Sequence, residues 1–393
     1  MFILKRAAVI LLAVASALSL LCLSGAATQP DTAVPTNDGA AQMTLDCRSA
    51  ILMEAGTGTV LFEQNADEAL PPASVTKIMT LLLVMEAIEQ GKICLDDTVT
   101  TSANAAGMGG SQIYLKEGEE MSVEDMLKSV VIASANDAAC ALAEFVSGSE
   151  EAFVRQMNER AKQLGMENSS FENTNGLDDT AKNHVTSARD IAIMSRELIK
   201  HKKILEYSSI WMDTVRGGTF GLTNTNRLVR FYRGCTGLKT GSTSKAGFCI
   251  SATAERDGVS LICVIMGAET RDIRNSLATR LLDYGFANYG VYSHTPEELE
   301  DVKVTCGVKD KLGIQYDKFE YTLPKGDVTK VTHKIEIPES VCAPIKKGDV
   351  VGKVTFELNG KQIGSRDVYA AEDVERIGFL ELWLRIMAKF LLK

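Results

Sequence analysis

The sequence predicts an α/β domain with an antiparallel sheet and a helical insertion, then a small all-β domain and a terminal amphipathic helix. β-prone runs at 47–53, 246–254 and 259–267 flank a long stretch of helical patterns, as expected of an α/β domain. Short segments with alternating apolar and polar residues begin near residue 298. With 393 residues, 45% of them hydrophobic, the chain is long enough for two or three domains with real cores.

The N-terminus has the pattern of a secretory signal peptide over residues 1–27. Lys5 and Arg6 precede an uncharged apolar run at 7–23, and small residues follow at 24–27, which suits cleavage by a signal peptidase. The alternative is an uncleaved membrane anchor; a lipoprotein is disfavoured because bulky Leu21 precedes Cys22. Residues 28–43 are predicted to be a flexible linker. Either way, we expect the bulk of the chain to be exported.

The predicted α/β domain covers residues 44–292. A hairpin begins it, followed by a helix at 74–90 that is apolar nearly all round and therefore belongs in a core. Further helices are predicted at 122–147, 150–164 and 186–200. Asp257-Gly258 is a strong turn signal between the last two strands, and a helix near 272–288 ends the domain.

Residues 298–370 are predicted to form the all-β domain, with strands near 301–306, 317–323, 329–337, 349–357 and 361–367. In the segment 374–393, four charged residues recur every fourth position, which on a helix makes one narrow polar stripe: Glu381, Arg385, Lys389 and Lys393. We expect this helix to lie in a membrane interface, which would hold the chain at the outer face of the cytoplasmic membrane. The alternative is a helix docked on the protein's own core.

Charge and cysteine usage exclude some function classes. The net charge of −9 argues against a nucleic-acid partner, because phosphate binding needs a basic footprint. Eight cysteines besides Cys22 are scattered without a Cys-x-x-Cys pair, so we expect no metal. Export would permit disulfides, and buried free thiols are an equal alternative.

The first chemistry-bearing motif is Ser74-Val75-Thr76-Lys77, at the start of the buried helix. Residues three apart share a helix face, so the lysine amine can reach the hydroxyl, and a partly desolvated lysine can act as a base. The alternative is a serine that only caps a helix. A second Ser-x-x-Lys, from Ser242 to Lys245, lies in a turn with no helix to align it.

The second motif is Ser134-Ala135-Asn136, between an apolar run and an alanine-rich helix. That context favours a rigid, inward-facing position. A second copy, from Ser102 to Asn104, precedes a Gly-rich stretch and is predicted to be a surface loop.

The third motif is Lys239-Thr240-Gly241, which occurs once and precedes the predicted hairpin. It is therefore expected on a sheet edge that borders a cleft. There the lysine would attract a substrate carboxylate, the threonine would hydrogen-bond it, and the glycine would allow close backbone approach. Alone, this motif would be interpreted as an exposed turn.

Taken together, the three motifs have the order described for active-site-serine β-lactamases and penicillin-binding proteins. The chain resembles the serine-type D-Ala-D-Ala carboxypeptidases, the low-molecular-mass penicillin-binding proteins of peptidase family S11. The resemblance runs over almost the whole mature chain and includes these stretches: 72–77, 136–138, 175–178, His184, 187–190, 237–241, 246–247 and 281–286.

The resemblance implies a β-lactamase/transpeptidase-like α/β fold and assigns roles. Ser74 resembles the acylated nucleophile, Lys77 its general base, and Ser134 a proton relay. Asn136 resembles a ligand of the substrate amide, and Lys239, Thr240 and Gly241 the carboxylate-binding strand. The oxyanion hole would be the backbone N–H groups of Ser74 and Ser242, and Arg274 would help to hold the carboxylate.

The implied reaction removes the terminal D-alanine from peptidoglycan pentapeptide without a cofactor, and β-lactams would be covalent inhibitors. A class A β-lactamase is the first alternative, but its Glu-x-x-x-Asn pattern is absent between residues 137 and 238. A Ser-His-Asp hydrolase using His184 and Asp190 is disfavoured because no Gly-x-Ser-x-Gly elbow exists. A non-catalytic wall-binding protein would be expected to have damaged motifs, whereas all three are intact.

Overall fold

The computed structural model describes residues 43–178 and 181–391. The predicted signal peptide and all but the last residue of the predicted linker lie outside these ranges.

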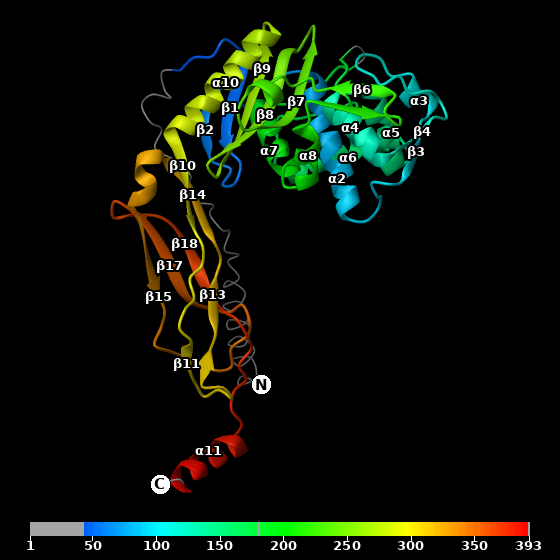
Figure 1. Cartoon of the computed structure of the whole chain (residues 1–393). Coiled ribbons are helices and arrows are strands. Elements are labelled where there is room, and N and C mark those ends of the chain that lie inside the picture. The colour runs from blue at the N-terminus through cyan, green and yellow to red at the C-terminus, as the bar shows by residue number, and fades with distance from the viewer. Residues whose placement is uncertain (1–42, 179–180, 392–393) are drawn as a thin grey trace, which may run out of the picture. The chain divides into compact units, whose positions relative to one another are not determined.

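The first domain is built on a five-stranded antiparallel sheet with the order β2-β1-β9-β8-β7 (Figure 1). The strands are β1 (Ser49–Glu54), β2 (Val60–Gln64), β7 (Cys235–Thr243), β8 (Gly247–Arg256) and β9 (Val259–Ala268). Helices α7 (Ala188–Leu198) and α10 (Arg271–Asn288) both pack on β9. Strand β7 is the last strand of this order and therefore an edge of the sheet, and it contains the Lys239-Thr240-Gly241 motif, as the sequence predicted.

The helical insertion lies between β2 and β7, in blue to green in Figure 1. It contains η1 (Ala73–Thr76), α2 (Lys77–Glu89), α3 (Ala103–Ala106), α4 (Val123–Ile132), α5 (Asn136–Ser147), α6 (Glu150–Gln163), α7, α8 (Lys202–Ser208) and α9 (Leu228–Phe231). Two small two-stranded sheets accompany them: β3 (Thr98–Thr100) with β4 (Glu120–Ser122), and β5 (Met212–Val215) with β6 (Phe220–Thr223). The apolar α2 is buried in the main core, as its composition predicted.

Two helix predictions need correction. The helix expected over 122–147 is two helices, because Ser134 between them has a left-handed φ of 64°, which no α-helix accommodates. The helix expected from Ser74 starts as a 3₁₀ turn and becomes α-helical at Lys77. Both departures lie at predicted catalytic motifs, where backbone strain is often stored.

The C-terminal strands form an all-β region, as predicted. Strand β10 (Tyr289–His294) pairs with β14 (Phe319–Pro324), which η2 (Lys325–Lys330) follows. A three-stranded sheet has the order β12 (Lys311–Leu312), β11 (Val302–Thr305), β16 (Ser340–Cys342). A four-stranded sheet has the order β13 (Ile314–Tyr316), β18 (Lys361–Ala370), β17 (Val350–Leu358), β15 (Val331–Glu336). Phe356 and its aromatic neighbours fill one of the two small cores.

The chain ends in helix α11 (Phe379–Leu391), which exposes large apolar side chains. Within residues 43–178 and 181–391, no helix is long and apolar enough to cross a bilayer. The eight cysteines in these ranges are free thiols, and Cys140, Cys249 and Cys263 are buried.

Candidate active site

The turn that contains Ser74 has a strained backbone and packs tightly against a neighbouring segment. Ala73 has a left-handed φ of 49°, unusual for a residue with a side chain. The backbone of Gly176 lies directly against it, because a Cβ there would come within 1.8 Å of the Ala73 carbonyl oxygen. In this turn the half-buried Ser74 hydroxyl is oriented toward the Lys77 side chain.

Lys77 is fully buried at the start of α2, and its Nζ has two partners. It donates to Ser74 Oγ at 2.9 Å and to the Asn175 carbonyl at 2.8 Å. Burial, followed by the positive charge of Lys239, lowers the pKa of Lys77 well below its usual 10.5. A lysine with a lowered pKa loses its proton more readily, and the neutral amine can then accept the serine proton.

A second serine–lysine pair faces the first. The strained turn between α4 and α5 presents Ser134, whose Oγ accepts a hydrogen bond from Lys239 Nζ at 2.8 Å. Burial and the charge of Arg274 lower the pKa of Lys239 to about 7. The two pairs therefore combine two hydroxyls with two amines whose pKa values are both lowered by burial and a neighbouring cation.

Asn136 closes this side of the site from the start of α5. Its Nδ2 donates to the Gly109 carbonyl at 2.6 Å, whereas its buried Oδ1 has no hydrogen-bond partner within residues 43–178 and 181–391. An orphaned acceptor in a site calls for an explanation, and a substrate N–H would satisfy it.

Strand β7 borders the nucleophile. A Cβ on Gly241 would come within 2.7 Å of the Ser74 backbone nitrogen, so only glycine permits this approach. Thr240 Oγ1 bonds to Thr225 Oγ1 at 2.8 Å. Ser242, the next residue, is exposed. The close approach places the backbone of Gly241 and Ser242 beside the nucleophile turn, as an oxyanion hole requires.

Ser74, Ser134 and residues of β7 line a cleft of about 570 Å³, whereas the buried Lys77, Asn136 and Lys239 are not among its lining residues. Its lining residues are Ser74, Ser111, Ser134, Trp211, Thr223, Asn224, Thr225, Arg227, Phe231, Thr240, Gly241, Ser242, Arg271 and Arg274. Three of them are arginines and none is acidic, so the cleft suits an anionic substrate. Arg274 was predicted from the sequence, but Arg227 and Arg271 were not. Arg271 lies one turn before Arg274 on α10, a spacing that could have revealed it; nothing in the local sequence marks Arg227.

The competing motif copies have other roles. Ser102 caps α3 and its hydroxyl donates to Glu144 at 2.5 Å. Lys245 donates to the Asp178 carbonyl at 2.7 Å rather than to Ser242.

His184 is a structural residue. Its Nδ1 accepts the Glu172 backbone N–H at 3.0 Å, so its Nε2 is left to donate to Thr76 Oγ1 at 2.7 Å. The Asp190 carboxylate accepts from Asn168 and Ser169. The structure therefore gives no support to a Ser-His-Asp arrangement.

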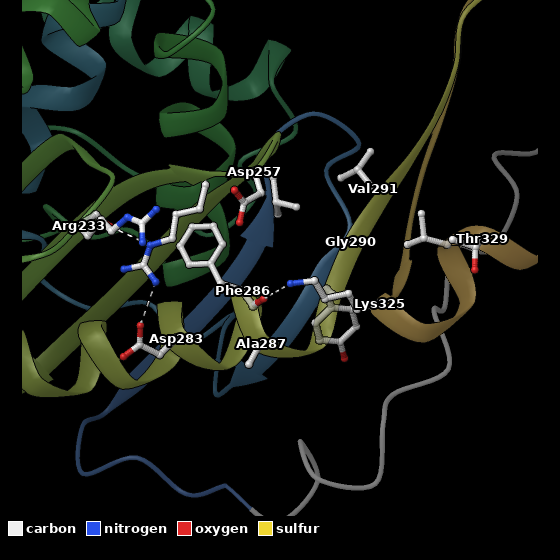
Figure 2. Close-up of a pocket in the computed structure, with 13 residues that line it drawn as sticks. Arg233, Asp257, Asp283, Phe286, Ala287, Gly290, Val291, Lys325 and Thr329 are labelled. Carbon is white, nitrogen blue, oxygen red and sulfur yellow. Dashed lines mark hydrogen bonds and ion pairs between the residues drawn. The ribbon is translucent and has the colours of Figure 1, made fainter.

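A second hollow, of about 590 Å³, lies beside α10 and η2 (Figure 2). Three of its charged side chains have partners: Arg256 pairs with Asp283 at 3.4 Å, and Lys325 donates to the Phe286 carbonyl. No residue of the three motifs lines it, so the catalytic chemistry belongs to the first cleft.

A serine paired with a buried, pKa-lowered lysine, beside a basic cleft, defines an active-site-serine acyl-transfer enzyme for anionic substrates. The sequence profile of the D-alanyl-D-alanine carboxypeptidases, peptidase family S11, matches residues 36–270. The profile of the penicillin-binding protein 5 C-terminal domain matches residues 294–376. The chain belongs to the D-alanyl-D-alanine carboxypeptidase family.

Individual relatives agree over most of the chain. It is 42% identical over 349 residues to D-alanyl-D-alanine carboxypeptidase DacF of Bacillus subtilis, covering 87% of this chain and 89% of that protein. It is 32% identical to DacA of Escherichia coli, with 85% of each chain covered. Penicillin-binding protein 5 of Haemophilus influenzae superposes with a TM-score of 0.74 at 32% identity, over 85% of this chain and 99% of that one. Penicillin-binding protein D2 of Listeria monocytogenes, solved in an ampicillin-bound form, gives 0.57 at 33% identity, over 62% and 99%.

Proposed function

We propose that the chain removes the terminal D-alanine from peptidoglycan pentapeptide through an acyl-enzyme on Ser74. The observation that carries this proposal is the 2.9 Å hydrogen bond between Lys77 Nζ and Ser74 Oγ, made by an amine whose burial lowers its pKa. The family and the relatives named above support the same reaction class.

In the first half-reaction, neutral Lys77 takes the Ser74 proton as Oγ attacks the carbonyl of the D-Ala-D-Ala bond. The backbone N–H groups of Ser74 and Ser242 receive the developing oxyanion. Ser134 relays this proton from Lys77 to the leaving amine, and free D-alanine departs, so that Lys77 is neutral again. Lys77 then takes a proton from the attacking water and returns it to Ser74 Oγ as the ester bond breaks, and the shortened peptide is released.

Recognition rests on charge. The substrate ends in a carboxylate, and Lys239, Thr240 and Arg274 supply two cations and a hydroxyl beside the nucleophile. Asn136 Oδ1, which lacks a hydrogen-bond donor among the described residues, would accept the substrate amide N–H. β-Lactams mimic this acyl donor and would acylate Ser74, leaving a stable ester.

Release of D-alanine from a Lys-D-Ala-D-Ala tripeptide tests the proposal. Ser74→Ala should lose activity by at least about 10³-fold, because no alternative nucleophile is aligned. Ser242→Ala is the matched control: it removes the competing Ser-x-x-Lys serine while keeping the backbone N–H, and should retain most activity. Substantial turnover by Ser74→Ala would contradict the assignment.

We also propose that the chain is exported and held on the outer face of the cytoplasmic membrane by α11. Phe379 and Leu380 are 85% and 69% exposed, and Trp383 is 50% exposed. Arg385 in the polar stripe pairs with Asp310 at 3.2 Å, so the polar side has a protein partner, whereas the large apolar side chains of the helix are exposed. An interfacial helix buries such a face in the lipid headgroup region.

A further inference from the structure

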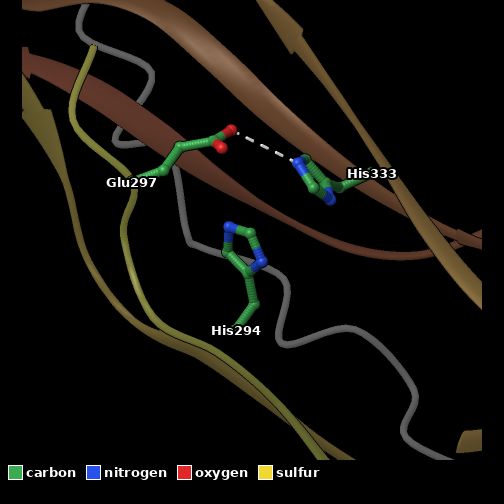
Figure 3. Close-up of side chains that lie close together, drawn as sticks. All are labelled: His294, Glu297 and His333. Carbon is green, nitrogen blue, oxygen red and sulfur yellow. Dashed lines mark hydrogen bonds and ion pairs between the residues drawn. The ribbon is translucent and has the colours of Figure 1, made fainter. Parts of the chain in front are cut away.

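Two of the chain's four histidines meet in the C-terminal β region, far from the catalytic cleft in sequence. His294 ends β10, Glu297 follows it, and His333 lies on β15. Each offers one ligand atom, and the three atoms lie within 4.8 Å of one another. Figure 3 shows the His294 ring facing the gap between the Glu297 carboxylate and the His333 ring.

We propose that His294, Glu297 and His333 bind one Zn²⁺ ion, with water completing the coordination. Two imidazoles and a carboxylate are a common zinc ligand set. In a tetrahedral site with bonds of about 2.0–2.1 Å, ligand atoms lie roughly 3.4 Å apart. His333 Nε2 and Glu297 Oε1 are already 3.4 Å apart, and both side chains are exposed enough to turn toward the ion.

Tyr316 holds two of the three ligands in place. Its buried hydroxyl accepts the Glu297 backbone N–H at 3.1 Å and lies 2.9 Å from His294 Nε2. If Nε2 carries the proton and donates it to this hydroxyl, Nδ1 keeps the lone pair that a cation needs. Zinc-binding histidines almost always donate their second N–H to an oxygen acceptor, most often a carboxylate, a backbone carbonyl or water, and the Tyr316 hydroxyl would take that place here. The Tyr316 ring also stacks on His294, with an interplanar angle of 16°.

The ligands come from different sheets. β10 pairs with β14, whereas β15 is the edge of the four-stranded sheet. A bound ion would therefore fasten β15 to the end of β10, and would stabilise the folded β region because the unfolded chain holds no preformed site. The inference is independent of the proposed catalytic function. Local sequence patterns did not indicate it, since two histidines this far apart have no spacing signature.

The test is a ZnCl₂ titration of the full chain by calorimetry, with thiols first blocked by N-ethylmaleimide because Cys94, Cys306 and Cys342 are exposed. Wild type should bind one ion with a dissociation constant below about 10 µM. His333→Gln should weaken binding at least about tenfold, and Glu297→Gln should weaken it less. The matched control is His201→Gln, which removes a histidine paired with a single glutamate, Glu89, at 3.3 Å, and should bind like wild type.

Two further measurements make the result decisive. Co²⁺ should give intense visible bands of a tetrahedral site in wild type and lose them in His333→Gln. His333 is exposed, so that variant should unfold in urea as wild type does without zinc, and it should release D-alanine normally. The proposal is overturned if wild type shows no saturable zinc binding, or if His333→Gln binds as wild type does.

Discussion

At the residue scale, the site depends on two lysines whose pKa values are lowered for the same reason. Both are buried, and each lies near another cation: Lys239 for Lys77, and Arg274 for Lys239. Sequence motifs identified both lysines, but not this coupling, because a pKa depends on the depth and neighbours that only the fold supplies. The sequence likewise could not predict that Asn136 Oδ1 lacks a hydrogen-bond partner in the fold.

The pKa of Lys239, about 7, predicts a pH dependence. A lysine is charged below its pKa and neutral above it, so attraction of the substrate carboxylate should fade, and kcat/KM should fall, as pH rises through about 7.

Arg274→Gln tests the cause. Removing its charge should raise the pKa of Lys239 and move the alkaline limb of kcat/KM to higher pH. At pH 6 it should also lower kcat/KM about tenfold, through the lost carboxylate contact. Arg274→Lys, which keeps the charge, should leave the limb where it is. If the alkaline limb of kcat/KM stays at the same pH in Arg274→Gln, the charge of Arg274 does not lower the pKa of Lys239.

At the element scale, the predicted helices and strands mostly agree with the structure, and the main departures lie at the site. Apolar periodicity predicted one helix over 122–147, but it could not show the left-handed Ser134 that splits it. The hairpin that follows Lys239 predicted a position on a sheet edge, and β7 is indeed an edge strand of the five-stranded sheet. Arg227 directly precedes the short helix α9, which no sequence pattern predicted.

His184 links the Glu172 backbone to Thr76 in the nucleophile turn. Burial lowers the pKa of His184 from 6.5 to about 4, so between these values the unfolded chain binds more protons than the folded one. This contribution to stability is therefore complete above pH 6.5 and is lost as pH falls toward 4, by about 3 kcal/mol.

Urea unfolding at pH 7.5 and pH 4.5 measures this loss. His184→Gln should be less stable than wild type at pH 7.5, and should lose about 3 kcal/mol less on acidification. Equal acid-induced losses in the two proteins would show that His184 is not the titrating group.

At the scale of the whole molecule, the chain joins a serine acyl-transfer site to a β region and an apolar terminal helix. The sequence predicted this order of parts because each has its own hydrophobic period. It could not predict which distant side chains meet, such as His294 with His333 or Thr225 with Thr240, because those contacts arise from folding.

Truncation after Val374 tests the anchor. The shortened chain should move from the membrane fraction to the soluble fraction, because α11 carries the exposed apolar side chains. D-Ala release should persist, since the cleft uses no residue of the helix. Unchanged membrane association would instead favour an uncleaved N-terminal anchor.

The central claim is that Ser74 carries the acyl group, and mass spectrometry of the penicillin-labelled chain tests it most directly. After labelling and proteolysis, the penicilloyl mass should lie on the peptide containing Ser74, and Ser74→Ala should show no label. A label on Ser242, or normal labelling of Ser74→Ala, would contradict the account.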